Sequence, residues 1–195
     1  MNGIPLLLLF IYSGFTINII LQCAIGIKGV AESKKTIDLE SVIKTFIIFF
    51  TIILMWFFFS RVVYPIIPGI FIYILLFPVS GLFYSYLEHV IFCYLLKKEM
   101  ESEPIISFPS GFTATAVFIC INISNNIMET IVLAFGFTSG IFFVNFIIME
   151  IRRRAALEAI PIFLRGKPLV LIAMGLLSLI FTTASLLFFR MINAG

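Results

Sequence analysis

Two very apolar stretches of the sequence contain thiol and amide side chains. The stretch INIILQCAIGIKG holds Asn18 and Cys23, and the stretch FICINISNN holds Cys120 and Asn122. Thiolates are the ligands that iron–sulfur clusters and other soft metals prefer, and amides tune such a centre by donating hydrogen bonds to sulfur. We therefore predict that Cys23 and Cys120 are metal ligands and that Asn18 and Asn122 help to bind the cofactor.

These two stretches supply fewer thiolates than an iron–sulfur cluster takes. A cluster is held by about four ligands, and the third cysteine, Cys93, has no suitable polar neighbours. A partner subunit would have to provide the remaining ligands. An alternative stays open, because amides in membrane helices often only bridge neighbouring helices and a buried cysteine often serves as a small apolar side chain.

A carboxylate and an imidazole stand next to each other in a third apolar stretch, at Glu88 and His89. An ionisable residue inside a membrane span is a functional candidate by default. We therefore predict that Glu88 and His89 belong to an ion or proton path. Lys97 and Lys98 follow closely, so a position at the membrane surface also stays open.

The composition indicates that the main solvent of this chain is a lipid bilayer. Of its 195 residues, 62% are hydrophobic and 12% are charged, whereas soluble domains average about 45–50% and about 25%. A net charge of +3 is too small to point to nucleic acid. The sequence contains no phosphate-binding GxxxxGK[ST], no GxGxxG and no HExxH motif. If this chain serves an enzyme, we expect other subunits to carry out the substrate chemistry, with this chain as a membrane subunit and not a catalyst alone.

Apolar runs predict an all-α integral membrane protein with six transmembrane helices in a single domain, residues 1–195. A span needs about 20 apolar residues, and helices satisfy every backbone group within the bilayer. The fourth and fifth runs meet with almost no loop, so one of those two helices is expected to be short or broken. The predicted spans are 4–27, 42–60, 66–95, 110–128, 130–150 and 168–190.

Three spans per half predict two inverted repeats, approximately 1–97 and 105–195. The two polar stretches then lie in corresponding helices, and such repeats commonly place a site near the bilayer midplane where discontinuous helices meet. Basic residues cluster in the first, third and fifth connections, for example at 152–154. By the positive-inside rule, both termini are predicted to face outward.

The last third of the chain, residues 135–181, carries a family resemblance. It contains an I-R-x-R element, then a Phe-x-Arg-Gly element and a final span rich in Ala, Gly, Leu and Ser. With weaker similarity upstream at Asn18, Ser33 to Lys35 and Glu88, this pattern resembles the Rnf/Nqr family of membrane electron-transfer subunits. The matching positions are Ile151, Arg152, Arg154, Phe163, Arg165, Gly166, Ala173, Gly175, Leu176, Ser178, Leu179 and Phe181.

The resemblance implies a subunit of an ion-translocating electron-transport complex in a bacterial or archaeal cytoplasmic membrane. Outward termini fit the A subunit of Rnf, which is the E subunit of Nqr. In this family two homologous subunits of opposite topology pair, and each gives two midplane cysteines to a [2Fe–2S] cluster. The complex moves electrons between nicotinamide and ferredoxin or quinone, coupled to sodium or proton movement. Expected partners are therefore the homologous subunit and the other Rnf/Nqr-type subunits.

The cysteine motifs depart from the G-L-C-P and N-C-A patterns of that family. Aligning on Asn18 puts Lys28 at the place of the first cysteine, and aligning on Asn122 leaves none at the second. Either Cys23 and Cys120 are ligands in a diverged setting, which we favour, or the chain has lost its cluster. The second possibility predicts a cluster-free small transporter or scaffold whose polar site uses Asn18, Gln22, Asn122, Asn125 and Glu88.

Overall fold

The computed structural model describes residues 6–22, 39–66, 69–95, 108–157, 161 and 166–194, and these residues form helices and short connections with no strand among them. The predicted all-α class is therefore confirmed for the described chain. The elements are α1 (Leu6–Ile11), the π-helical turn η1 (Tyr12–Thr16), α2 (Ile19–Gln22), α4 (Leu39–Phe58), the π-helical turn η2 (Phe59–Val63), α5 (Gly69–Leu95), α6 (Phe108–Ile123), α7 (Ile127–Leu157) and α8 (Lys167–Ala194).

Four of the described helical segments are long and apolar enough to cross a membrane. They are Val42–Val63, Phe71–Tyr94, Ile127–Ala155 and Pro168–Leu187. The structure is thus compatible with a multi-pass membrane protein, with four candidate spans where the sequence predicts six. The arrangement in two inverted repeats stays a prediction.

The two remaining predicted spans are represented by shorter apolar helices, Leu6–Leu21 and Gly111–Ile123. The first is interrupted after η1. The second lies in α6, whose 16 residues measure about 24 Å, less than a hydrocarbon core of about 30 Å. The sequence predicted that one of the two helices joined near Asn125 is short or broken, and α6 is short, whereas α7 has 31 residues.

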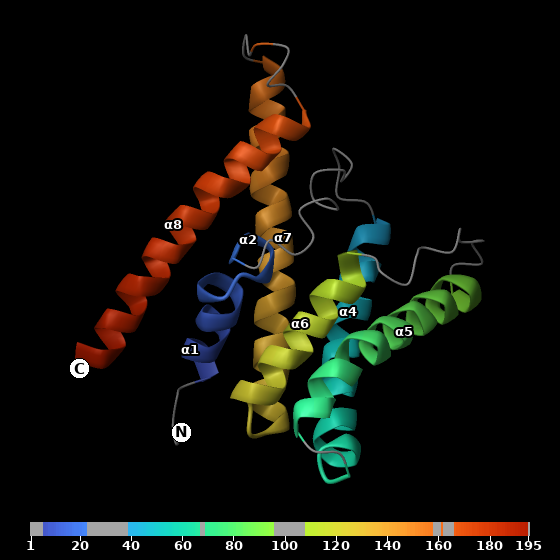
Figure 1. The fold of residues 1–195 in the computed structure, drawn as a ribbon. Coiled ribbons are helices and arrows are strands. Elements are labelled where there is room, and N and C mark those ends of the chain that lie inside the picture. The colour runs from blue at the N-terminus through green and yellow to red at the C-terminus, as the bar shows by residue number, and fades with distance from the viewer. Residues whose placement is uncertain are drawn as a thin grey trace.

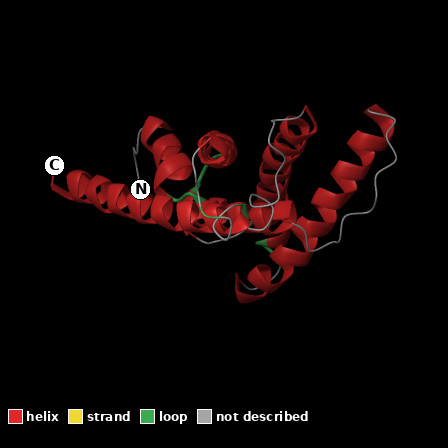
Figure 2. Cartoon of the chain, turned by 90° about the horizontal axis from the view of Figure 1, so that it is seen from above, coloured by secondary structure: helices red, strands yellow, loops and turns green. Residues whose placement is uncertain are grey.

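Helix α7 is the centre of the arrangement, since α1, η1, α2, α4, α6 and α8 all contact it. Figure 1 shows α7 running the length of the molecule, with α8 leaning away on one side and α5 on the other. In the view down α7, α8 and α5 extend in opposite directions from it (Figure 2). Helix α1 begins and α8 ends at the same end of the molecule (Figure 1).

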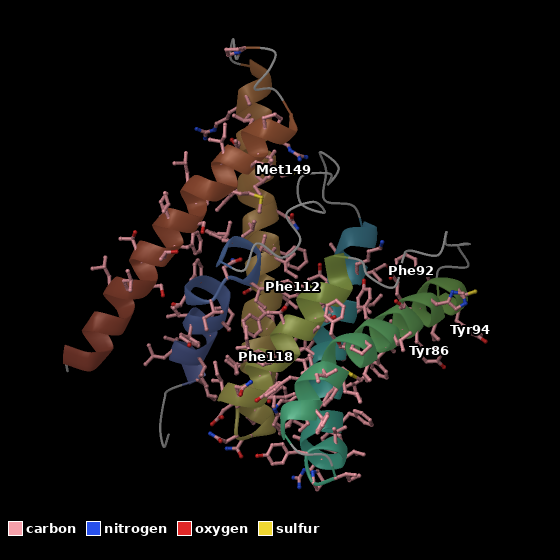
Figure 3. The ribbon with its side chains drawn as sticks, viewed as in Figure 1. Tyr86, Phe92, Tyr94, Phe112, Phe118 and Met149 are labelled. Atoms are coloured by element: carbon pink, nitrogen blue, oxygen red, sulfur yellow. The ribbon has the colours of Figure 1, made fainter. Side chains whose placement is uncertain are left out.

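The buried core lies where α4, α6 and α7 meet, with Ile52, Val117 and Leu133 each 0% exposed. The outlying helices instead carry apolar surface. On α5, Tyr86 and Tyr94 point away from the bundle while Phe92 lies on the buried face (Figure 3). Apolar surface of this extent fits contact with lipid, because the bilayer core is as apolar as these side chains.

Candidate functional site

The first helix is broken at Asn18, and the side chain of that residue satisfies the break. Ile17 leaves the helical conformation, with φ −107° and ψ 65°. Asn18 Oδ1 accepts a hydrogen bond from the Leu21 N–H at 3.3 Å, and its Nδ2 donates to the Gly14 carbonyl oxygen at 3.3 Å. One buried amide therefore caps the start of α2 and replaces a bond of the interrupted helix.

Glycines on α7 let the broken helix approach closely. A methyl group on Gly136 would lie 1.8 Å from Ser13 Oγ, and one on Gly140 would lie 3.0 Å from the Gly14 oxygen and 3.3 Å from Asn18 Nδ2. Two glycines four apart form a small-xxx-small contact between membrane helices. This pair was not predicted, although its spacing is visible in the sequence segment GFTSG.

The depth of Asn18 follows from that contact. Gly140 lies 13 residues after Ile127 and 15 before Ala155, the ends of the candidate span. At 1.5 Å per residue, it lies about 20 Å along α7 from its first residue. Asn18 is therefore near the middle of this span.

Cys120 lies close to the turn that joins α6 to α7. Its carbonyl oxygen accepts hydrogen bonds from the backbone N–H of Ser124 at 2.9 Å and from the Ser124 hydroxyl. Ser124 Oγ in turn accepts a bond from Thr130 Oγ1 at 2.9 Å. Cys120 is thus within about one helical turn, ~5 Å, of the end of α6, at a different depth from Asn18.

Asn122 lies on the exposed surface at the same end of α6. Its Oδ1 accepts a hydrogen bond from the Tyr73 hydroxyl at 3.3 Å, and its Nδ2 donates to the Phe118 carbonyl oxygen at 2.7 Å. Asn122 therefore ties α6 to α5. Nearby, the Asn125 N–H donates to Glu129 Oε2 at 2.8 Å, which fixes the start of α7.

The described residues do not by themselves fit an iron–sulfur cluster. Cys23 lies outside them, so the predicted cysteine pair is not placed. Cys120 is 0% exposed, so its thiol is enclosed by this chain and does not face a surface that a partner could share. Among the described residues, no group of three or more His, Cys, Asp and Glu side chains gathers to hold a metal.

Glu88 forms an ion pair that the sequence analysis did not predict. Lys44 Nζ of α4 lies 3.3 Å from Glu88 Oε1 of α5, and the two side chains are 21% and 8% exposed. Lys44 stands two residues inside the candidate span Val42–Val63, and Glu88 stands six residues before the end of Phe71–Tyr94. The pair therefore lies within about 9 Å, or two helical turns, of the end of the spans.

The surroundings of this pair are polar on one face of α5. Ser80 and Tyr84 precede Glu88 at intervals of four residues, and both are 0% exposed. Residues four apart lie on the same helical face, so Glu88 ends a buried polar row. His89 is exposed and points from a different face, so the structure does not bring it to Glu88.

Several hydroxyl groups in the described helices bond within their own helix. Thr51, Thr115 and Thr138 each donate to the carbonyl oxygen four residues earlier, at 2.7, 2.9 and 2.9 Å. Such bonds satisfy the hydroxyl within its own helix. The polar side chains that link different helices, notably Lys44 with Glu88 and Asn122 with Tyr73, are therefore the stronger functional candidates.

Comparison with known proteins gives no further assignment: no protein-family model matches the chain, and no curated protein matches it.

Proposed function

We propose that this chain is a membrane subunit of a redox-driven, ion-translocating complex of the Rnf/Nqr type, with two inverted three-helix repeats and both termini outside. One observation supports this proposal. The leading helices of the two proposed repeats are the short ones, α1–α2 and α6, and α2 contacts α6. Short or broken helices that meet between repeats are typical of membrane proteins with an ion or substrate site inside the bilayer.

Within such a complex, Glu88 and Lys44 are the groups of this chain best suited to handle the translocated ion. Carboxylates and ammonium groups are costly inside a membrane and mark ion pathways. A pair within two turns of the end of its spans can exchange with the adjacent aqueous phase. The electron-carrying chemistry belongs to the complex, which includes a homologous subunit of opposite topology.

The proposal has two versions that differ in the cofactor. In the first, Cys23 and Cys120 contribute to a [2Fe–2S] cluster shared with the homologous partner. In the second, the chain has no cluster and contributes helices and an ion path. The burial of Cys120 within this chain supports the second version.

Purification of the chain from its native membrane in mild detergent tests the proposal. Co-purification of a homologous six-span protein and flavin-containing subunits is the expected result, and isolation of the chain without redox partners would contradict it. Iron content and visible absorption then separate the versions. Loss of both in Cys120→Ser, with retention in the control Cys93→Ser, supports the cluster, and unchanged iron in both variants supports the cluster-free version.

A second candidate function, a cluster-free transporter, is favoured by the Lys44–Glu88 pair because that pair needs no redox partner to bind an ion. Purified chain reconstituted alone into vesicles tests this function. Ion flux that is lost in Glu88→Gln would support a transporter, whereas flux only in the presence of the co-purifying subunits would support the complex.

A further inference from the structure

The exposed face of α4 carries a row of large apolar side chains that leads to one arginine. Phe50, Leu54 and Phe57 are 56%, 46% and 51% exposed. Arg61 follows Phe57 by four residues and is exposed as well. Residues three and four apart share a helical face, so these side chains lie one above the other. We call these four residues the α4 strip.

The size of these side chains indicates that lipid, and not another helix, covers the α4 strip. Helices that pack against each other in membranes use small residues, because small side chains let the backbones approach. The contact of η1 with Gly136 and Gly140 of α7 follows that rule, whereas the α4 strip contains two phenylalanines and a leucine. From Phe50 to Arg61 the strip is about 16 Å long. This is roughly half of a hydrocarbon core of about 30 Å and matches the acyl chains of one leaflet.

Arg61 lies at the end of the span, at the level expected for lipid headgroups. It stands two residues before the end of the candidate span Val42–Val63. It belongs to the π-helical turn η2, in which the Tyr64 N–H donates to the Phe59 carbonyl oxygen at 2.9 Å, and such turns are frequent at functional sites. Tyr64 is 67% exposed, and tyrosines are typical of the interface between membrane and water.

The guanidinium group of Arg61 has no counter-charge within the part of the chain that the structure describes. Arg154, by contrast, is paired with Glu150 at 3.0 Å. A guanidinium fork matches two oxygen atoms of a phosphate group, and basic residues near a membrane surface attract anionic lipids. A zwitterionic headgroup brings its own cation, which competes with Arg61 for the phosphate, so a headgroup without a cation fits better.

We propose that the α4 strip binds an anionic phospholipid, whose phosphate bonds to Arg61 and whose acyl chains lie along the three apolar side chains. The inference needs only that α4 lies in a bilayer, so it is independent of the proposed electron-transport function. The end of α4 that leads to Arg61 and the arginine-bearing end of α7 are at opposite ends of the molecule (Figure 1). Arg61 and Arg154 therefore meet the lipids of different leaflets.

Quenching of tryptophan fluorescence by brominated lipids tests the proposal in vesicles that contain the purified full-length chain. Because Trp56 is the only tryptophan in the sequence, the double variant Trp56→Phe, Leu54→Trp has a single reporter on the strip. Brominated phosphatidylglycerol is expected to be enriched at this reporter about fivefold over brominated phosphatidylcholine at equal mole fraction, as one arginine near a membrane surface gives. Adding Arg61→Gln is expected to abolish the preference, whereas the control Arg154→Gln, which removes the same charge, is expected to keep it.

Four results would overturn the proposal. Equal quenching by the two lipids is one, and a preference that survives Arg61→Gln, or that Arg154→Gln removes equally, is another. Absence of quenching by either lipid would show that protein covers the strip. Inorganic phosphate, exchanged for chloride at constant ionic strength, is expected to leave the preference unchanged. Loss of the preference in phosphate would assign Arg61 to free phosphate and not to a lipid.

Discussion

Asn18 and Glu88 are both polar side chains inside apolar helices, and the structure stabilises them in different ways. Asn18 bonds to the backbone of its own helix on both sides of a break. Glu88 is held by a charge from another helix. The first arrangement shapes a helix, whereas the second joins α4 to α5 through an ion pair.

Replacing Asn18 with alanine removes the cap of α2 and the bond to Gly14. Loss of a helix cap costs about 0.5–2 kcal/mol, and the buried carbonyl left without its partner adds about 1–3 kcal/mol. We expect Asn18→Ala to lower the midpoint of unfolding in detergent clearly. Asn122→Ala is the matched control, because it also removes two amide hydrogen bonds but at an exposed site. Equal losses in the two variants would contradict the role of burial.

Replacing only Lys44 or only Glu88 is expected to destabilise the protein more than replacing both residues together. Loss of one partner of a buried pair costs about 3–5 kcal/mol, and the low end applies because Lys44 is 21% exposed. A double-mutant cycle of Lys44→Met and Glu88→Gln, read as free energies of unfolding, measures the coupling. Additive single losses would show that the two groups act independently.

At the scale of the element, the contact between η1 and α7 leaves no space for a side chain. Gly136→Ala would bring its methyl group 1.8 Å from Ser13 Oγ, and overpacking of this kind costs about 1–3 kcal/mol. We expect a lower unfolding midpoint, with partial recovery in Gly136→Ala, Ser13→Gly. Gly175→Ala, whose added methyl meets nothing within 4 Å, is the control and is expected to be neutral or slightly stabilising. A Gly136→Ala variant as stable as this control would refute the contact.

The elements also show what hydropathy predicts and what it does not. The apolar runs 42–60, 66–95 and 168–190 correspond to described helices. The length of an apolar run is enough to predict a helix of this kind. The break at Asn18 is different, because Asn18 packs next to Gly140 of α7, which is far away in the sequence. The Lys44–Glu88 pair depends on the register of α4 against α5, and apolar periodicity carries no information on that register. The sequence therefore does not indicate that Lys44 pairs with Glu88.

The site prediction is limited for the same reason. The amides and Cys120 were recognised by residue type, but depth in the bilayer depends on where helices end. The hydrogen bonds among Ser124, Thr130 and Cys120 place that cysteine beside a turn. Asn18 instead packs against the middle of the neighbouring helix α7. Sequence position within an apolar run does not distinguish these two depths.

At the scale of the whole molecule, the length of helix α7 can be compared with the thickness of a membrane. Its 31 residues measure about 46 Å, longer than a hydrocarbon core of about 30 Å. One end of α7 carries Arg152 to Arg154, and Arg154 pairs there with Glu150 at 3.0 Å. By the positive-inside rule, we propose that this end faces the cytoplasm and that the turn between α6 and α7 faces outward.

This orientation predicts which positions a membrane-impermeant thiol reagent reaches in whole cells. In a Cys93→Ser background, Asn125→Cys in the α6–α7 turn is expected to react from outside, because the residue is exposed. Arg153→Cys, which is also exposed, is expected to react only after the cells are opened. The opposite pattern would invert the chain in the membrane and place both termini in the cytoplasm. Labelling of both positions from outside would show that α7 does not span the bilayer at all.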